Sequence, residues 1–233
     1  MRGSRWLWWG LGLVAVALLV VGGVKAAQAP PPPITGVQTE EKVMALSINV
    51  VWGTDYVPSL LNILQRHHAT ATFMLGGAWA QAHPDLVRAL AAAHMELGNH
   101  GYGHRHSSLL DLRQNLSEIE RTNQVVAAIS GQTPRLFAPP YGEYNPTVLQ
   151  AAHQLGMPVI LWTLDTIDWR PSSSPEQIVA RVLPRARPGA IVLLHPTDRT
   201  VEALPQLLDG LQRQGYRLVT VSDLLRLGPP RHD

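Results

Sequence analysis

From Lys42 onward, short apolar or β-branched runs alternate with segments of helical periodicity. The apolar runs are VMALSI, ATATFML, MPVILWTL, AIVLLH and YRLVTV. The segments between them repeat apolar residues at the spacing of an amphipathic helix. They cover residues 57–66, 84–94, 109–129, 145–155, 175–183 and 201–212. Strands that alternate with helices predict βαβ units around a parallel sheet, open or closed into a barrel.

The N-terminal region is an uncharged apolar run behind two arginines. Residues 6–24, WLWWGLGLVAVALLVVGGV, would rise about 28 Å as a helix, close to the roughly 30 Å hydrocarbon core of a bilayer. Because Arg2 and Arg5 precede the run, the rest of the chain is expected outside the cytoplasm. Residues 1–25 are therefore interpreted as a signal anchor that contacts the membrane. Residues 27–29, Ala-Gln-Ala, resemble a cleavage site, so a cleaved signal peptide and secretion stay open.

The rest of the chain is divided by composition. Residues 26–41 contain APPPPITG, which predicts an extended linker, and a globular domain is expected over residues 42–226. Residues 227–233 are expected to form a disordered tail. Three of the 19 basic residues and none of the 17 acidic residues lie in residues 1–25, so the remainder is nearly neutral. It lacks the basic patch of a nucleic-acid-binding protein. The absence of cysteine excludes disulfides and thiolate chemistry.

Polar side chains gather where the apolar runs end. In α/β barrels, side chains at the carboxyl ends of the strands and in the following loops form the functional site. The residues at these ends are Asn49, Gly76, Gly77, Asn99, His100, residues 139–142, residues 165–169 and His195. Histidines and carboxylates are concentrated among them, which indicates a site at this edge of the sheet.

Two histidines four positions apart are candidate metal ligands. His100 and His104 lie in ELGNHGYGH, and a helical turn after Asn99 would project both imidazoles from one face, where they could share a metal ion. His106 would lie on another face of such a helix. A chance pair is the alternative, because the chain has ten histidines.

Two further strand ends suggest acid chemistry and ligand binding. AIVLLH ends in His195, which could act as a general acid if an aspartate raises its pKa; a histidine satisfied at the edge of the core is the alternative. LWTLDTIDW supplies two aspartates and a tryptophan. FAPPYG is a rigid turn that could present Tyr141 and backbone N–H groups to an oxyanion or a sugar, or could be purely structural.

Taken together, these segments resemble the polysaccharide deacetylase family, also described as the NodB homology domain or carbohydrate esterase family 4, over about residues 42–225. ATATFMLGGAW is similar to the second strand of that family, and ELGNHGYGH to its His-x-x-x-His metal motif. FAPPYG, DTIDW and LLH are similar to its arginine-Pro-Pro-Tyr-Gly, Asp-Trp and Leu-x-His motifs. The resemblance implies a distorted (β/α)7-type barrel. It also implies metal-dependent removal of N-acetyl groups from a cell-wall or related polysaccharide, such as peptidoglycan or a chitin-like glycan.

The resemblance also implies roles for individual residues. His100 and His104 would bind a divalent metal (zinc, cobalt or nickel), and His195 would protonate the departing amine. Asp168 would hold and tune His195. Trp169 and Leu193 would shape the acetyl pocket, and Tyr141 would contribute contacts near the oxyanion.

The chain departs from the family pattern at three positions. The Thr-Phe-Asp-Asp segment of the family aligns with residues 47–50, so Asn49 replaces the catalytic base and Val50 replaces the third metal ligand. An amide does not accept a proton at neutral pH, and valine has no ligand atom. Ala138 replaces the arginine that orients the base. Arg135 is not expected to substitute for it, because an odd offset on an extended strand points to the opposite face.

Two hypotheses follow from these replacements. NVVWG and FAPPYG resemble a branch of the family associated with spore-forming bacteria that has the same replacements. In the first hypothesis the chain is a working deacetylase in which Asp55, the only nearby carboxylate, or Asn49 itself completes the site. In the second it is a non-catalytic glycan-binding protein that retains the pocket.

Overall fold

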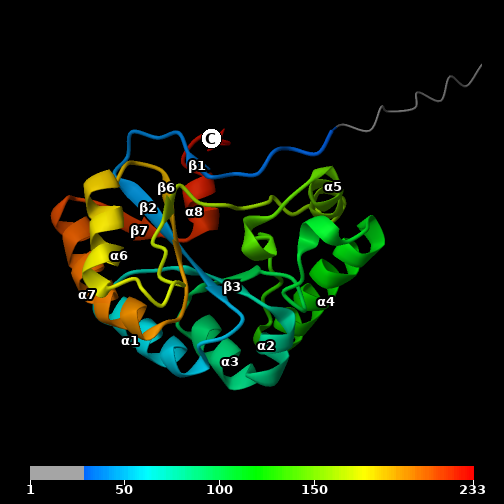
Figure 1. The fold of residues 1–233 in the computed structure, drawn as a ribbon, viewed down its shortest axis with the longest axis horizontal. Helices are drawn as coiled ribbons and strands as arrows, with labels where there is room; N and C mark the ends of the chain where they lie inside the picture. Colours follow the sequence, from blue (N-terminus) through cyan, green and yellow to red (C-terminus); the bar gives the residue numbers. More distant parts are fainter. Residues whose placement is uncertain (1–28) are drawn as a thin grey trace, which may run out of the picture.

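The computed structural model of the chain describes residues 29–233 (Figure 1). The signal anchor or signal peptide expected over residues 1–25 lies outside the described residues. Over residues 29–233, no helix combines the length and the apolar character needed to cross a bilayer.

The centre of the fold is strand β2 (Val43–Val50), which is buried along its whole length. One edge of β2 pairs in parallel with β6 (Ala190–Leu194). The other edge pairs with β7 (Arg217–Val219) near its start and with β3 (Thr72–Leu75) near its end. A parallel strand that is covered on both faces is apolar at nearly every position, which explains why the sequence pattern identified this strand.

The sheet curls toward a barrel but closes on one side only through isolated bridges. β3 pairs with β4 (Glu96–Asn99), Asn99 bridges Phe137, and Phe137 bridges Val159. The chain then continues into β5 (Leu164–Asp165), which pairs with β6. The prediction of an α/β fold is confirmed, and the sheet has the curvature of a distorted, incompletely closed barrel. Residues 157–164, expected to be a full strand, form only these short pairings.

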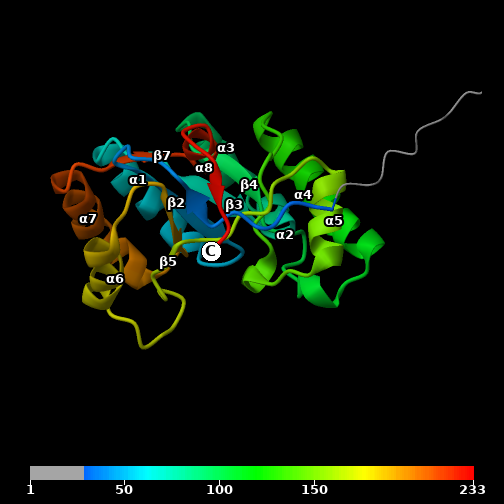
Figure 2. The same ribbon diagram turned by 90° about the horizontal axis from the view of Figure 1, so that it is seen from above.

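Eight α-helices lie around the sheet in the described residues. They are α1 (Val57–Arg66), α2 (Gly77–Ala82), α3 (Pro84–Ala92), α4 (Leu112–Ser130), α5 (Pro146–Gln154), α6 (Pro175–Val182), α7 (Asp198–Arg213) and α8 (Val221–Leu225). Figures 1 and 2 show α6 and α7 on one side of the sheet and α4 and α5 on the other. Capping boxes at Asp111 and Ser174 begin α4 and α6, because each side chain accepts a hydrogen bond from an otherwise unpaired N–H of the first turn.

Both ends of the described chain belong to the domain, which corrects two expectations. Residues 26–41 were expected to be a linker, yet Ile34 bridges Ile160 and strand β1 (Gly36–Val37) pairs with β6. Residues 227–233 were expected to be disordered, yet β8 (Pro230–Arg231) pairs antiparallel with β1. The side chain of Val37 is fully buried in an apolar cluster, so its burial offsets the cost of ordering these segments.

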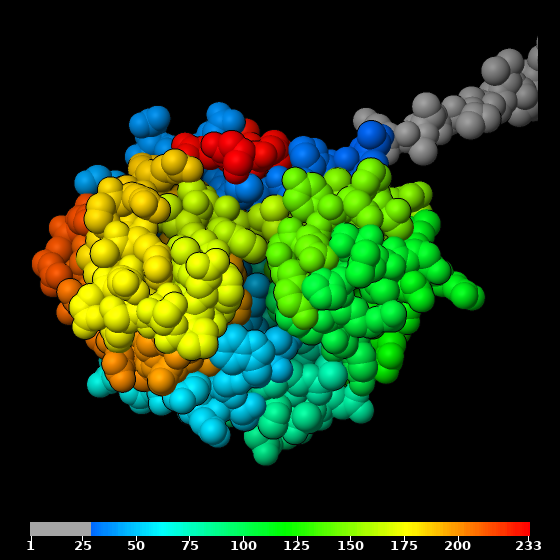
Figure 3. Space-filling view, viewed as in Figure 1, coloured from blue at the N-terminus to red at the C-terminus, as the bar shows by residue number. Residues whose placement is uncertain are grey.

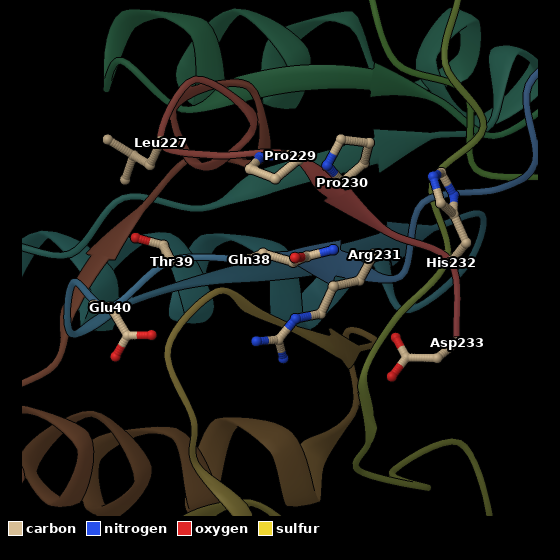
Figure 4. Close-up of a pocket in the computed structure, with 9 residues that line it drawn as sticks. All are labelled: Gln38, Thr39, Glu40, Leu227, Pro229, Pro230, Arg231, His232 and Asp233. Carbon is tan, nitrogen blue, oxygen red and sulfur yellow. The ribbon is translucent and has the colours of Figure 1, made fainter.

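The paired ends form a shallow groove on the surface. Figure 4 shows the C-terminal residues beside residues 38–40. The groove that these residues line has a volume of about 870 Å³. Its lining consists of Gln38, Thr39, Glu40, Leu227, Pro229, Pro230, Arg231, His232 and Asp233. The tail is held by backbone hydrogen bonds, from Thr35 N–H to the Arg231 carbonyl at 2.9 Å and from Gln38 N–H to the Pro229 carbonyl at 2.9 Å.

Deletion of residues 230–233 is expected to lower the free energy of unfolding by about 2 kcal/mol, because it removes several hydrogen bonds that each contribute roughly 0.5–1.5 kcal/mol. Thermal unfolding followed by circular dichroism measures the change. Arg231→Ala, which keeps the backbone pairing, is the control and is expected to have little effect. Equal stability of the truncated and full-length chains would show that the tail contributes nothing.

Candidate functional site

A cavity of about 400 Å³ lies at the carboxyl ends of strands β2, β5 and β6. Figure 3 shows the surface hollowed between the yellow segment that follows β5, the green segments opposite and the light-blue loop that follows β2. The cavity is lined by Asn49, Val51, Trp52, His100, His104, Tyr141, Gly142, Trp162, Asp165, Trp169, Leu193 and His195. Seven of the nine candidate site residues therefore meet in one place; of the other two, Asp168 lies behind His195 and Asp55 lies elsewhere.

The two candidate metal ligands are brought together by a loop, not by a helical turn. Residues 100–106 form no helix, and Gly101 and His104 adopt positive φ angles of 71° and 49°. The imidazole centroids of His100 and His104 are nevertheless 4.9 Å apart. Asn99 fixes the start of this loop, because its side chain accepts the Gly101 N–H at 2.8 Å and donates to the Ile119 carbonyl at 2.8 Å. The expected pairing is thus present, whereas the expected helical path was wrong.

The surroundings of the histidine pair favour neutral imidazoles. His100 Nδ1–H donates to the Ala138 carbonyl at 2.7 Å, which leaves Nε2 with a free lone pair. Burial, with a contribution from His104, lowers the pKa of His100 to about 3. Burial also lowers the pKa of His104, with smaller contributions from His195 and His106. A neutral imidazole with one free ring nitrogen is the form that binds a metal ion.

Asn49 and Val50 lie on opposite faces of the end of β2. The Asn49 side chain lines the cavity, and its Oδ1 is buried without a hydrogen-bond partner among the described residues. The Val50 side chain instead packs into the main apolar core. Adjacent residues on a regular strand point to opposite faces, so position 50 does not face the cavity along this backbone path. A buried acceptor without a partner costs free energy, and in native proteins it often marks a functional position.

The cavity wall offers few donors for a divalent cation. Two neutral imidazoles and the unpaired amide oxygen of Asn49 are available at the cavity wall. Zinc sites normally use three or four protein ligands. Among residues 29–233, no group of three or more histidine, cysteine, aspartate or glutamate side chains could hold a metal ion. The side chains that could hold a cation are therefore two imidazoles and the neutral amide oxygen of Asn49, because Val50, at the aligned ligand position, has no donor atom.

His195 has the support expected for an acid. Its Nδ1 lies 2.8 Å from Asp168 Oδ1, and its backbone N–H donates to Asp168 Oδ2 at 2.6 Å. Thr200 Oγ1–H donates to the same Oδ2 at 2.7 Å. Because Asp168 is fully buried and acts only as an acceptor when ionised, it keeps the proton of His195 on Nδ1. The Nε2 atom of His195 is then free to exchange a proton with a ligand.

Tyr141 lies in a strained turn against the histidines. Its φ of 61° is unusual for a residue with a side chain. The Tyr141 ring lies 4.6 Å from the His104 ring and stacks on His106 at 4.1 Å with an interplanar angle of 12°. His106 is held in turn by Glu143, 3.0 Å from its Nδ1. From the sequence, His106 was not expected to bind the metal together with His100 and His104. In the structure, its imidazole supports the Tyr141 ring by stacking.

Asp55 and Arg135 lie outside the cavity lining. Asp55 is exposed on a short 3-10 turn, η1 (Thr54–Tyr56), and is not part of the cavity lining. Arg135 lines a separate surface pocket with Glu96 and Leu97, as the odd offset from position 138 predicted. Among residues 29–233, no arginine lines the cavity, and the one carboxylate in its lining is Asp165, whose Oδ1 accepts the Ile167 N–H at 2.7 Å.

Sequence reasoning missed three residues that line the cavity. They are Val51, Trp52 and Trp162. Trp162 lies within the apolar run of residues 157–164, whereas candidate residues were sought only where such runs end. Val51 and Trp52 follow the end of β2, and their approach to the site depends on the path of the loop, which periodicity does not define.

His104→Ala is expected to weaken zinc binding by about 10-fold or more, because it removes one of the two imidazole ligands. Titration calorimetry of the full-length chain with zinc measures the affinity. His153→Ala, a histidine of α5 outside the cavity, is the matched control and is expected to leave the affinity unchanged. Equal affinity of His104→Ala and the wild type would place the metal elsewhere.

Comparison with known proteins identifies the family of this chain. Residues 36–160 match the family model for polysaccharide deacetylase. The chain is 36% identical to uncharacterized protein YlxY of Bacillus subtilis over 195 residues, which cover 84% of this chain and 61% of YlxY. It is 35% identical to a peptidoglycan-N-acetylglucosamine deacetylase of Bacillus cereus over 201 residues, 82% of this chain and 91% of that protein.

A solved structure adds a relative with a similar fold. A CE4 family pseudoenzyme from Bacillus anthracis superposes with a TM-score of 0.81 at 37% identity and covers 84% of this chain and 69% of its own. A mutant of that pseudoenzyme has restored enzymatic activity and superposes equally well. The matched family model, the shared fold and the motifs that meet in the cavity show that this chain belongs to the polysaccharide deacetylase family.

Proposed function

We propose that this chain binds N-acetylated cell-wall glycan in the cavity and hydrolyses it far more slowly than relatives with a carboxylate base. The observation that carries the proposal is Asn49, whose unpaired amide oxygen occupies the position of the base. A general base contributes about 10²–10⁴ to the rate of such reactions. The similarity to the Bacillus anthracis pseudoenzyme supports the same conclusion.

The remaining residues suit the binding of an acetamido sugar. Trp169 and Leu193 provide the apolar wall for a methyl group, and Tyr141 presents its ring at the opening. His100 and His104 would hold a divalent cation, zinc, cobalt or nickel, which when bound polarises a carbonyl oxygen. His195 would donate a proton from Nε2 to the departing nitrogen, while Asp168 keeps Nδ1 protonated.

Glycan binding without any hydrolysis is the second candidate, but the hydrogen-bonded group around His195 favours slow deacetylation. Asp168, His195 and Thr200 form a complete hydrogen-bonded group that a glycan-binding protein does not require. Residual catalysis without a general base would depend on this hydrogen-bonded group and on the cation. The two candidates differ in rate, not in the ligand that they bind.

We propose the substrate class from the relatives and the compartment from the sequence. Peptidoglycan deacetylases of Bacillus cereus and Bacillus subtilis are among them, so we propose peptidoglycan as the ligand, with a chitin-like glycan as its closest substitute. Peptidoglycan lies outside the cytoplasm, in keeping with an anchor at residues 6–24. The relatives from Bacillus are also in keeping with the spore-former branch to which NVVWG points.

The proposal is tested with the full-length chain, N-acetylated chito-oligomers and purified peptidoglycan. We expect saturable binding of the N-acetylated oligomer and no binding of its fully deacetylated form. Acetate release with zinc, cobalt or nickel is expected to be at least about 10²-fold slower than that of the Bacillus cereus deacetylase measured alongside. Acetate release at the rate of that enzyme would contradict the proposal, and so would a failure to bind either glycan.

A further inference from the structure

Trp52 is an exposed indole at the opening of the cavity, on the loop that follows β2. Its side chain is 42% exposed, and its ring lies parallel to the His195 imidazole, with an interplanar angle of 4° and centroids 5.8 Å apart. Six large apolar side chains are exposed over residues 29–233, and three of them, Trp52, Tyr141 and Trp169, line this one cavity. Such a concentration around one opening is typical of a binding site.

The backbone holds Trp52 in this position. Gly53 has a φ of 69°, and a Cβ atom there would lie 2.0 Å from the Pro196 carbonyl oxygen. Only glycine therefore allows the loop to pack against the residue that follows His195. On the far side of the loop, Thr54 Oγ1 accepts the indole N–H of Trp79 at 3.1 Å. The loop is thus held on the C-terminal side of Trp52, at Gly53 and at Thr54.

The fold itself does not account for the exposure of Trp52. Trp79, by contrast, is only 6% exposed, packs in the core and has its N–H satisfied by Thr54. Leaving an indole half in water forgoes much of its hydrophobic stabilisation. The negative π-face of an indole attracts the positively polarised C–H groups on the apolar face of a pyranose ring. An exposed indole beside the proton donor is therefore suited to a sugar ring.

We propose that Trp52 is a positioning residue for the glycan: its exposed face packs on a pyranose ring and holds the acetamido group of the glycan beside His195. This inference rests on the proposed glycan-binding function. It assigns a ligand contact to the loop that occupies the place of the first family motif. It also explains the glycine at position 53, which allows this loop to pack against Pro196.

The test compares three substitutions in the full-length chain by titration calorimetry with an N-acetylated chito-oligomer. Trp52→Ala and Trp52→Leu are expected to raise Kd about 10-fold or more, whereas Trp52→Phe is expected to stay within about 3-fold of the wild type. Leu and Phe both preserve an apolar side chain, so their comparison isolates the aromatic face even if the Ala variant folds poorly. Tyr56→Ala is the control, because Tyr56 is an exposed aromatic residue of the same loop that does not line the cavity.

The outcomes separate this inference from the proposed function. If the wild type binds and Trp52→Leu binds equally well, the inference is overturned while glycan binding stands. If Trp52→Phe binds as weakly as Trp52→Leu, the aromatic face is not the cause and the inference is again overturned. If the wild type does not bind the oligomer at all, the proposed function fails first.

Discussion

Asn49→Asp is expected to raise acetate release from N-acetylated glycan by about 10²-fold, at the lower end of the contribution of a general base. The substitution changes one amide to a carboxylate of the same shape, at a buried position that already lines the cavity. The Asn49 Oδ1 atom has no hydrogen-bond partner among residues 29–233, so the substitution breaks no bond accepted by that oxygen. The gain is limited because Ala138 supplies no arginine to orient the new base and Val50 supplies no ligand.

The measurement is acetate release by the full-length chain with added zinc, cobalt or nickel. Asn49→Leu is the matched control, since it has a similar volume without a polar atom and is expected to show no gain over the wild type. The double variant Asn49→Asp/His195→Ala is expected to lose the gain, because it removes the acid. If Asn49→Asp releases no more acetate than Asn49→Leu, position 49 is not the base position and the aligned motif has been misread.

The sequence predicted the parts of the fold that depend on continuous apolar runs. β2 and β6 were expected from residues 43–48 and 190–195, and both lie at the centre of the sheet. β4 (Glu96–Asn99) was not expected as a strand, because two of its four residues are polar and one is glycine. Its partner β3 and the Phe137 bridge impose the extended conformation that its composition does not favour.

The candidate site was predictable as a set of strand ends, but not in its loop paths. His100 and His104 meet as expected, although through positive φ angles and the contacts of Asn99 instead of a helix. Asp55 follows Asn49 closely in sequence, yet Gly53 and Pro196 turn the chain so that Trp52 reaches the cavity and Asp55 does not. Such a turn depends on a contact between residues far apart in the chain, which local pattern does not reveal.

Asp168→Ala is expected to lower the free energy of unfolding by about 3 kcal/mol, the largest stability loss predicted for a single side chain of the site. The carboxylate is fully buried and joins three segments: the loop after β5, His195 after β6, and Thr200 in the first turn of α7. Its removal leaves the His195 N–H and the imidazole N–H without an acceptor, and leaves the Thr200 hydroxyl with only the Thr197 hydroxyl at 2.7 Å. Each unsatisfied donor costs about 1–3 kcal/mol, less what local rearrangement and water recover.

This loss is measured by thermal unfolding, where 3 kcal/mol corresponds to a fall in Tm of roughly 6–12 °C for a chain of this size. Asp85→Ala is the control, because that carboxylate is 92% exposed and pairs only with Arg88 at the surface, where an ion pair contributes about 0–1 kcal/mol. Asp168→Asn keeps the shape but replaces one acceptor by a donor, so an intermediate loss is expected. A fall below 2 °C for Asp168→Ala would mean that the three segments are held by packing alone. The hydrogen-bonded group of Asp168, His195 and Thr200 would then require a functional explanation. The predicted loss would instead give a structural reason for its retention in a chain without a catalytic base.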